Sequence, residues 1–452
     1  MKVLVLAAGL GKRMKSKYPK VVHKILGKPM INWVVDLGKK FGEVGVVVGH
    51  KAEIVQSYLP EDVKTYLQQP QLGTGHAVMC AKEFISSTED VLILYGDVPL
   101  LKAETIERLQ HVHVESKADV TVLTFIANDP TGYGRIVRKG GKVKIVEHKD
   151  ATEEERKINE VNSGIYIFSG KFLLENIMKL TNNNAQGEYY LTDLVEMAGK
   201  VETLLLDDSI QVSGVNDRTQ LAQLEFVARE RILREMMLSG VTIVDPSSIF
   251  IGPDVVVGMD TIINPFTIIE GKTTIGEDCE IGPYTRIVDS KIGNEVKILR
   301  SEVERTTIYD KVSVGPFARL REGTVLKEKV KIGNFVETKK SVIGKNSKAQ
   351  HLTYLGDATV GEDVNIGAGT ITCNYDGYKK YPTYIGDGAF IGSNSSLVAP
   401  VKIGRGAITG AGSVITEDVP DDALALGRAR QVVKENWAKN KREALKDANN
   451  KE

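Results

Sequence analysis

The most constraining feature of this chain is an aliphatic residue followed by glycine, which recurs at intervals of six residues or multiples of six between Ile251 and Ile403. The adjacent pairs are Ile251-Gly252 with Val257-Gly258, Ile275-Gly276 with Ile281-Gly282, Val360-Gly361 with Ile366-Gly367, and Ile385-Gly386 with Ile391-Gly392. Longer gaps keep the period, since Val257 to Ile275 spans eighteen residues and Ile391 to Ile403 spans twelve. This period predicts a parallel β-helix, a prism with three flat sides whose aliphatic side chains point inward and stack from coil to coil.

Length and composition indicate a globular protein of two or three domains. The 452 residues exceed one ordinary domain, and 42% hydrophobic with 26% charged residues is typical of a globular chain. Lysine plus arginine equals aspartate plus glutamate at 59 each, so no excess positive charge draws the chain to nucleic acid or to a membrane. Any phosphate must therefore be bound by local sites.

The cysteines and the N-terminal run favour a cytoplasmic protein. Cys80, Cys279 and Cys373 are odd in number, far apart and without metal-ligand spacing, which argues against disulfides and zinc. The apolar run at residues 3–8 is too short for a signal peptide and is expected to be the first β-strand. No stretch approaches the roughly 18 apolar residues of a transmembrane helix.

The first half of the chain alternates apolar, β-branched runs with polar helical stretches, as a parallel sheet with crossover helices requires. We expect strands at residues 2–6, 44–48, 91–95, 120–125 and 165–168. This alternation of strand-like and helix-like segments ends near Asp217 and predicts an α/β domain over residues 1–217.

A long helix and the repeat follow this domain. Residues 218–238 carry Leu221, Leu224, Ala228 and Ile232 at helical spacing without glycine or proline, which predicts a linker helix within 218–240. The β-helix domain is expected over 241–452, with its coils ending near Ile415. Residues 434–452 are almost wholly polar, and we expect a mobile tail or one held by a partner subunit.

A glycine loop leaves the first predicted strand. Residues 6–14 read Leu-Ala-Ala-Gly-Leu-Gly-Lys-Arg-Met, and Lys20 follows. Glycines let backbone N–H groups approach an anion, and Arg13 and Lys20 add positive charge. The loop lacks the third glycine of a dinucleotide fingerprint and the Ser or Thr of a Walker loop. An ordinary strand-to-helix turn remains the alternative.

Asp97 is the best candidate metal ligand. It lies in Leu-Tyr-Gly-Asp-Val-Pro at residues 94–99, at the end of a predicted strand, where open α/β sheets bind ligands. A carboxylate there suits a hard cation such as Mg²⁺ beside phosphates, although an aspartate that only caps a turn would look the same. Further motifs stand at residues 71–77, 131–136, 146–151, 161–164 and 214–217.

This ordered series resembles the sugar nucleotidyltransferases. Joined to a hexapeptide repeat, the chain is similar over nearly its whole length to the bacterial family of bifunctional N-acetylglucosamine-1-phosphate uridyltransferases and glucosamine-1-phosphate acetyltransferases. The resemblance implies a Rossmann-like domain that binds UTP and a sugar 1-phosphate, with Mg²⁺ held by Asp97 and Asn216. The implied nucleotide and sugar contacts are Leu6, Ala7, Ala8, Gly9, Lys20, Gln68, Gly73, Thr74, Tyr95, Gly96, Gly134, Glu147 and Asn162. Lys12 stands where the family usually carries threonine, which leaves the phosphate contacts of that loop open.

The period of the repeat breaks in two places. Ile343 to Val360 spans seventeen residues and Ile366 to Ile385 spans nineteen, and both gaps hold polar and aromatic residues. Departures from a regular scaffold are where binding sites usually sit. The first gap contains His351, the one histidine of the chain's seven that lies in the repeat half. Acetyl transfer to an amine needs a base with a near-neutral pKa and donors for the oxyanion, and neutral histidine fits the first role.

The family resemblance assigns roles in the second half. It implies that His351 is the general base and that Arg321, Lys339, Tyr354 and Asn365 contact the sugar phosphate. The acetyl-CoA positions are Ala368, Ser393, Ala411 and Arg428, with Asn374 and Tyr375 in a loop beside them. A charged coil exposed to solvent would account for the arginines and lysines equally well if each stood alone.

The resemblance therefore implies acetylation of glucosamine 1-phosphate by acetyl-CoA. It implies that uridylyl transfer from UTP to N-acetylglucosamine 1-phosphate then gives UDP-N-acetylglucosamine and releases pyrophosphate. It also implies a left-handed β-helix and a homotrimer that binds small molecules, without nucleic acid or membrane as partner. One alternative is a single-activity sugar-1-phosphate nucleotidyltransferase whose β-helix is structural or regulatory. A second is a non-catalytic scaffold, against which the retained Gly9, Lys20, Asp97 and Asn216 argue.

Overall fold

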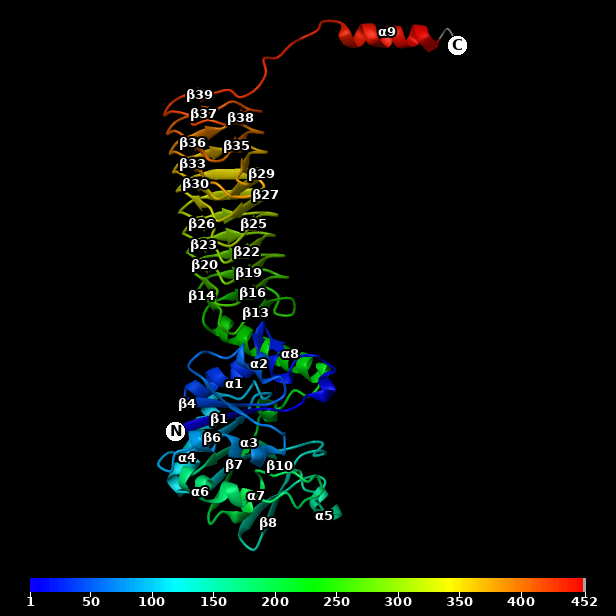
Figure 1. Cartoon of the computed structure of the whole chain (residues 1–452), viewed down its shortest axis with the longest axis vertical. Coiled ribbons are helices and arrows are strands. Elements are labelled where there is room, and N and C mark those ends of the chain that lie inside the picture. The colour runs from blue at the N-terminus through cyan, green and yellow to red at the C-terminus, as the bar shows by residue number, and fades with distance from the viewer. Residues whose placement is uncertain (450–452) are drawn as a thin grey trace. The chain divides into compact units, whose positions relative to one another are not determined.

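The computed structural model describes residues 1–449, with side chains through residue 446, and divides into two compact units. The first unit comprises Met1–Arg234 with Ile251–Pro253, and the second comprises Glu235–Phe250 with the residues from Asp254 onward. Figure 1 shows a sheet flanked by helices in the first unit and stacked coils of short strands in the second.

The first unit is built on a nine-stranded sheet with the order β11-β7-β10-β6-β1-β4-β5 and a hairpin, β8–β9, attached to β10. Its strands are β1 (Lys2–Ala7), β4 (Glu43–Val48), β5 (Lys64–Leu67), β6 (Val91–Tyr95), β7 (Val120–Ile126), β8 (Arg135–Lys139), β9 (Lys142–Val146), β10 (Glu160–Phe168) and β11 (Val201–Leu206). The five predicted strands are present, and β10 runs antiparallel to both its neighbours β6 and β7. Strands β5, β8, β9 and β11 were not predicted. A separate small hairpin joins β2 (Lys24–Ile25) to β3 (Lys28–Pro29).

Helices cover both faces of this sheet. They are α1 (Met30–Lys39), α2 (Ala52–Gln56), α3 (Thr74–Cys80), α4 (Ala103–Ser116), α5 (Glu153–Arg156), α6 (Gly170–Asn176) and α7 (Asp193–Met197). Alternate residues of β1 face opposite cores, because successive side chains of a strand point to opposite faces. Val3 and Val5 pack with α1, α2 and α4, whereas Leu4 and Leu6 pack with α3, α6 and α7.

The long helix α8 (Arg218–Leu238) begins and ends where the sequence predicts. Leu224 and Ala228 are buried in a cluster with Met14, Met30 and Val215, so part of the helix packs in the first unit. Within residues 1–449, no helix has the length and apolar character needed to cross a membrane.

The second unit is a three-sided prism of parallel strands. One side holds β12 (Thr242–Ile243), β15 (Ile262–Ile263), β18 (Glu280–Ile281), β21 (Lys297–Ile298), β24 (Ser313–Val314), β27 (Lys331–Lys339), β29 (Lys348–Gly356), β31 (Asn365–Ile366), β34 (Phe390–Ile391), β37 (Ile408–Thr409) and β39 (Leu424–Ala425). The next side holds β13 (Phe250–Ile251), β16 (Ile268–Glu270), β19 (Arg286–Val288), β22 (Glu302–Glu304), β25 (Arg319–Leu320), the second halves of β27 and β29, β32 (Ile371–Cys373), β35 (Ser396–Val398) and β38 (Val414–Ile415). The third holds β14 (Val256–Val257), β17 (Thr274–Ile275), β20 (Lys291–Ile292), β23 (Thr307–Ile308), β26 (Val325–Leu326), β28 (Val342–Ile343), β30 (Ala358–Val360), β33 (Thr383–Ile385) and β36 (Val401–Ile403). We call these sides A, B and C in that order.

The predicted stacking of aliphatic residues is confirmed. Ile263, Ile281 and Ile298 occupy equivalent positions in successive coils of side A, and each is fully buried. Aliphatic residues take most of these inward positions and build a continuous core from coil to coil, as repeat architectures require. Buried threonines take the equivalent positions at Thr338, Thr372 and Thr409.

The structure shows what the two predicted breaks are and corrects the predicted end of the repeat. The gap from Ile343 to Val360 makes no irregular loop, because β27 and β29 continue around the corner from side A to side B in register. The gap from Ile366 to Ile385 does hold a loop, at residues 374–382. The coils also extend beyond Ile415, since β39 pairs with β37.

The predicted tail contains the helix α9 (Trp437–Asn449). Its final residues, 450–452, lie outside the described part of the chain.

Candidate active sites

A cavity of about 400 Å³ lies where β1 and β6 end. Strand order reverses at this point, because β1 pairs with β4 on one edge and with β6 on the other. Such a switch point is the usual ligand site of an open α/β sheet. Most of the residues predicted to bind nucleotide line it, namely Leu6, Ala7, Ala8, Gly9, Lys20, Gln68, Gly73, Thr74, Tyr95 and Asp97.

Lys20 joins the two predicted metal ligands at this cavity. Its ammonium donates to a carboxylate oxygen of Asp97 and, over 3.3 Å, to the side-chain oxygen of Asn216. The three residues come from a short helical turn at Lys20–Val22, the segment after β6 and the segment before α8. Two hard oxygen atoms therefore converge on one cation, which is the donor set that Mg²⁺ prefers. No group of three or more His, Cys, Asp or Glu side chains forms a metal cluster within the described residues.

A second group of predicted residues lies around the base of the β8–β9 hairpin. The backbone N–H of Asn162 donates to the carbonyl of Gly134 over 2.9 Å. A Cβ built on Gly134 would lie 3.6 Å from Glu147 Oε1 and 3.6 Å from the Cβ of Asn162. Gly134, Glu147 and Asn162 are therefore neighbours. Removal from solvent raises the pKa of Glu147, although its oxygen accepts a hydrogen bond from Thr192 at 3.2 Å. Burial also raises the pKa of Tyr95, and the charges of Glu147 and Asp97 add to this effect.

Gly73 shows why the loop before α3 needs glycine. Its φ is +103°, and a Cβ there would lie 2.6 Å from the carbonyl oxygen of Tyr189. Gly73 follows Leu72, which accepts a backbone hydrogen bond from Tyr189 at 2.8 Å. Residues 188–189 thereby come to the rim of the cavity.

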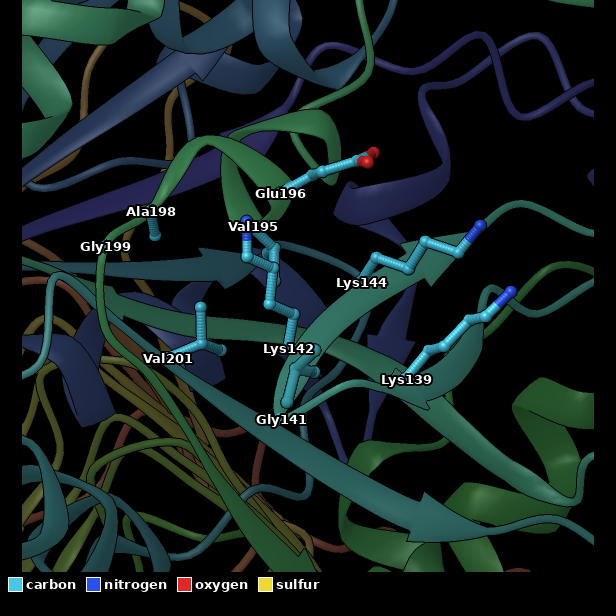
Figure 2. A pocket seen from close by; sticks show the side chains of 10 residues that line it. Lys139, Gly141, Lys142, Lys144, Val195, Glu196, Ala198, Gly199 and Val201 are labelled. Carbon is cyan, nitrogen blue, oxygen red and sulfur yellow. The ribbon is translucent and has the colours of Figure 1, made fainter.

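A different cavity of about 320 Å³ lies between the β8–β9 hairpin and the segment from α7 to β11. Figure 2 shows Lys139 and Lys144 leaving the hairpin in similar directions, with Glu196 on the neighbouring helix. None of the predicted site residues lines it.

In the prism, His351 and three predicted acetyl-CoA positions lie along the corner between sides A and B. Backbone hydrogen bonds connect successive coils at this corner. The N–H of Gly369 donates to the carbonyls of His351 and Leu352. In the next coils, the N–H of Asn394 donates to the carbonyl of Ala368, and the N–H of Gly412 donates to the carbonyl of Ser393. The corner column is His351, Ala368, Ser393 and Ala411. His351 is exposed, as a base that meets a soluble substrate must be.

The predicted sugar-phosphate residues are divided between two sides of the prism. Arg321, Lys339 and Tyr354 lie on side B, where Arg321 donates to Glu337 over 2.8 Å and this hydrogen bond raises the pKa of its guanidinium. Asn365 lies on side A, across the corner that carries His351. The described chain therefore does not gather all four residues on one face.

The loop after β32 carries Asn374 and Tyr375. Asn374 is buried, and its amide nitrogen donates to Asp357 over 2.6 Å, whereas Tyr375 is exposed. Arg428 is exposed in the segment after β39.

The corner between sides A and B also carries a ridge of exposed side chains, which we define as Phe266, Tyr284, Arg300, Phe317, Phe335 and Leu352. Each has a positive φ. Phe266 stacks on Tyr284 with ring centroids 4.9 Å apart, and Phe317 stacks on Phe335 at 5.3 Å. His351 lies at the end of this ridge.

Comparison with known proteins identifies the family. Residues 3–161 match the MobA-like NTP transferase domain, and residues 251–288 and 382–417 match the bacterial transferase hexapeptide. The chain is 80% identical to the "Bifunctional protein GlmU" of Fervidobacterium nodosum over 452 residues, covering 100% of both chains. The proteins of that name from Thermosipho africanus and Thermosipho melanesiensis are 66% and 63% identical, again with 100% of both chains covered. The chain belongs to the GlmU family of bifunctional proteins.

Membership of the GlmU family confirms the predicted fold class, a Rossmann-like nucleotidyltransferase domain followed by a left-handed parallel β-helix. It also confirms a bifunctional enzyme that combines nucleotidyltransferase and acetyltransferase activities in one chain. The single-activity alternative and the non-catalytic scaffold are thereby set aside.

Several cavity residues of this GlmU family member were missed by sequence reasoning. Leu10, Val21, Gln71, Ala77 and Glu188 also line the nucleotide cavity. Four of them adjoin or lie within motifs already singled out, but no local pattern marks Glu188. Asp357, the partner of Asn374, was likewise missed because only the tertiary structure pairs these residues.

Proposed function

We propose that the chain makes UDP-N-acetylglucosamine in two steps. The prism acetylates glucosamine 1-phosphate with acetyl-CoA, and the first unit transfers the uridylyl group of UTP to the product. The observation that carries the uridylyl half is the convergence of Lys20, Asp97 and Asn216 at the nucleotide cavity. The presence of both activities in one chain is supported by the similarity to GlmU proteins over the full length.

In uridylyl transfer, a phosphate oxygen of the sugar attacks the α-phosphorus of UTP in line, and the bond to the β-phosphate breaks to release pyrophosphate. The backbone of Leu6, Ala7, Ala8 and Gly9 lies beside the phosphates, and Lys20 neutralises their negative charge. The remaining nucleotide and sugar contacts are made by Tyr95, Gly96, Gly134, Glu147 and Asn162. Gln68, Gly73 and Thr74 hold the nucleotide.

Asp97 and Asn216 would hold Mg²⁺, since both oxygens already converge on the Lys20 ammonium. A bound Mg²⁺ would supply charge neutralisation at the phosphates. UTP and acetyl-CoA are co-substrates rather than resident cofactors.

In acetyl transfer, His351 accepts the proton of the sugar amine as the amine nitrogen attacks the thioester carbonyl. The carbon–sulfur bond of the resulting tetrahedral intermediate then breaks, and the CoA sulfur leaves as a thiol after taking up the proton from His351. Arg321, Lys339, Tyr354 and Asn365 bind the sugar phosphate. Ala368, Asn374, Tyr375, Ser393, Ala411 and Arg428 bind acetyl-CoA. Asp357 supports this arrangement because it accepts a hydrogen bond from the amide of Asn374.

The functional protein is a homotrimer in the cytoplasm. Two features support self-association, the exposed aromatic ridge and the division of the sugar-phosphate residues between sides A and B. Large exposed apolar patches mark interaction surfaces, and closed symmetric oligomers are the common outcome. The functional boundaries are 1–217 for the uridyltransferase, 218–240 for the linker helix and 241–452 for the acetyltransferase.

Mass spectrometry of the products tests both activities. Purified protein is incubated with glucosamine 1-phosphate, acetyl-CoA, UTP and Mg²⁺, and a parallel sample omits UTP. We expect N-acetylglucosamine 1-phosphate without UTP and UDP-N-acetylglucosamine with it. Absence of acetylated sugar from both samples would contradict the acetyltransferase assignment.

Two variants form reciprocal controls in this experiment. His351→Ala should reduce acetyl transfer by about 10²- to 10⁴-fold and leave uridylyl transfer unchanged. Asp97→Ala should abolish uridylyl transfer and leave acetyl transfer intact. Normal acetylation by His351→Ala would remove His351 from the mechanism, and loss of both activities in Asp97→Ala would indicate misfolding.

A further inference from the structure

The side-chain amide of Gln68 is held in one orientation at the wall of the nucleotide cavity. Gln68 is 4% exposed, and its Nε2 donates to the carbonyl oxygen of Gly73 over 2.9 Å. A carbonyl oxygen can only accept a hydrogen bond, so the amide atom facing Gly73 must be the nitrogen. This contact uses one of the two amide protons.

His76 takes the second amide proton of Gln68. Its Nδ1 lies 3.3 Å from Gln68 Nε2, and its Nε2 lies 3.8 Å from Cys80 Sγ. Because Gln68 Nε2 only donates, Nδ1 must accept, and the single proton of the neutral ring is then on Nε2, facing Cys80. The Tyr189 ring lies beside His76 in a tilted arrangement, with ring centroids 6.2 Å apart, and helps to fix the imidazole.

Gln68 can therefore offer a ligand only its oxygen. Gln68 is among the side chains that line the cavity, whereas His76 is not, so His76 acts from behind Gln68. With both amide protons committed to Gly73 and His76, Oε1 is the remaining polar atom, and it can only accept a hydrogen bond.

We propose that His76 is a positioning residue that selects the base of the nucleotide by locking Gln68 Oε1 as an acceptor. The inference rests on the proposed uridylyl transfer. Uracil presents N3–H, a donor, to such an acceptor, whereas cytosine presents a lone pair at N3 and would leave both groups unsatisfied. The lock therefore favours UTP over CTP. It does not separate uracil from thymine, which carries the same N3–H.

Nucleotide selectivity in two variants of His76 tests this role. The measurement is kcat and KM for UTP and for CTP, with N-acetylglucosamine 1-phosphate as the acceptor. His76→Phe keeps a planar ring but removes the acceptor, and it should lower the ratio of kcat/KM for UTP to that for CTP by about 10-fold or more, mainly through KM for UTP. His76→Asn places an oxygen near the position of Nδ1 and should retain the wild-type ratio.

Acetyl transfer by the same variants reports folding and should equal that of the wild type. An unchanged ratio in His76→Phe would overturn the inference, and so would an equal fall in both variants, which would indicate ring packing rather than the lock. A wild-type enzyme that uses CTP as well as UTP would also overturn it while leaving uridylyl transfer in place. A wild-type enzyme that transfers neither nucleotide would contradict the proposed function itself.

Discussion

At the scale of single residues, the nucleotide site depends on where a few charges are placed. Lys20 stands between Asp97 and Asn216, so one cation already satisfies two oxygen ligands before any substrate binds. Glu147 is the opposite case, a carboxylate drawn away from solvent without a cation beside it, and its pKa is raised for that reason.

Glu147→Gln should stabilise the first unit at neutral pH and impair uridylyl transfer. The folded state binds the Glu147 proton more tightly than the unfolded chain does. The stability linked to this proton is therefore present at low pH and is lost as pH rises through the raised pKa of the folded state. Thermal unfolding of wild type and variant should show a gain in Tm at pH 7 that vanishes in acid.

The same variant should lower uridylyl transfer by about 10- to 100-fold, because a charged hydrogen-bond acceptor for the sugar is lost. Acetyl transfer serves as the internal control and should be unaffected. A Tm difference that grows toward acid pH would contradict the assignment of a raised pKa.

At the scale of elements, the prism tolerates strained backbone where two coils approach each other. Gly315 has a φ of +99°, and a Cβ there would lie 2.1 Å from the carbonyl oxygen of Leu299 in the preceding coil. Gly388 also has a positive φ, of +65°, but no atom lies within 4 Å of the place for its Cβ. An alanine at Gly388 would therefore carry only the cost of a positive φ, whereas an alanine at Gly315 would carry this cost and that of steric overlap.

Gly315→Ala should reduce the free energy of unfolding of the prism by about 3 to 5 kcal/mol, since strain and overlap add. Gly388→Ala is the matched control and should cost only about 1 to 2 kcal/mol. Urea denaturation followed by circular dichroism measures both. Equal losses in the two variants would show that the approach of Leu299 does not matter.

At the scale of the whole molecule, the exposed ridge is notable because it leaves apolar side chains of a single chain in contact with water. Phe317 and Phe335 stack with their planes 7° apart and are 50% and 58% exposed. Such a surface is costly in water and is expected to be buried by a second copy of the chain.

The double variant Phe317→Asp with Phe335→Asp should dissociate the proposed homotrimer. Charges placed in the contact would have to be desolvated without partners. Sedimentation velocity should show a shift to smaller species, acetyl transfer should fall with it, and uridylyl transfer should persist. Tyr309→Asp, which changes an exposed aromatic residue just after β23 on side C, is the control and should leave the mass unchanged. A double variant with the wild-type mass would exclude the ridge from the interface.

Much of the fold was predictable because its signals are local. The inward aliphatic residue recurs at a fixed step, and the helix Arg218–Leu238 shows its own spacing and end. The missed strands β8 and β9 carry several lysines and arginines and are joined by two adjacent glycines. Their pairing is stabilised by β10 and by each other rather than by an apolar run. The extra coil after Ile415 was missed because its strand β39 departs from the six-residue period.

The sequence by itself determined the two-part architecture, the family and the identity of most candidate site residues, because period, motif and order are properties of short segments. Only the tertiary structure decided which distant side chains meet. The convergence of Lys20 with Asn216, the lock of Gln68 by His76 and the pairing of Asn374 with Asp357 all depend on which strands lie side by side. The same holds for the ridge, since residues a coil apart come into contact only when the chain has wound around the prism.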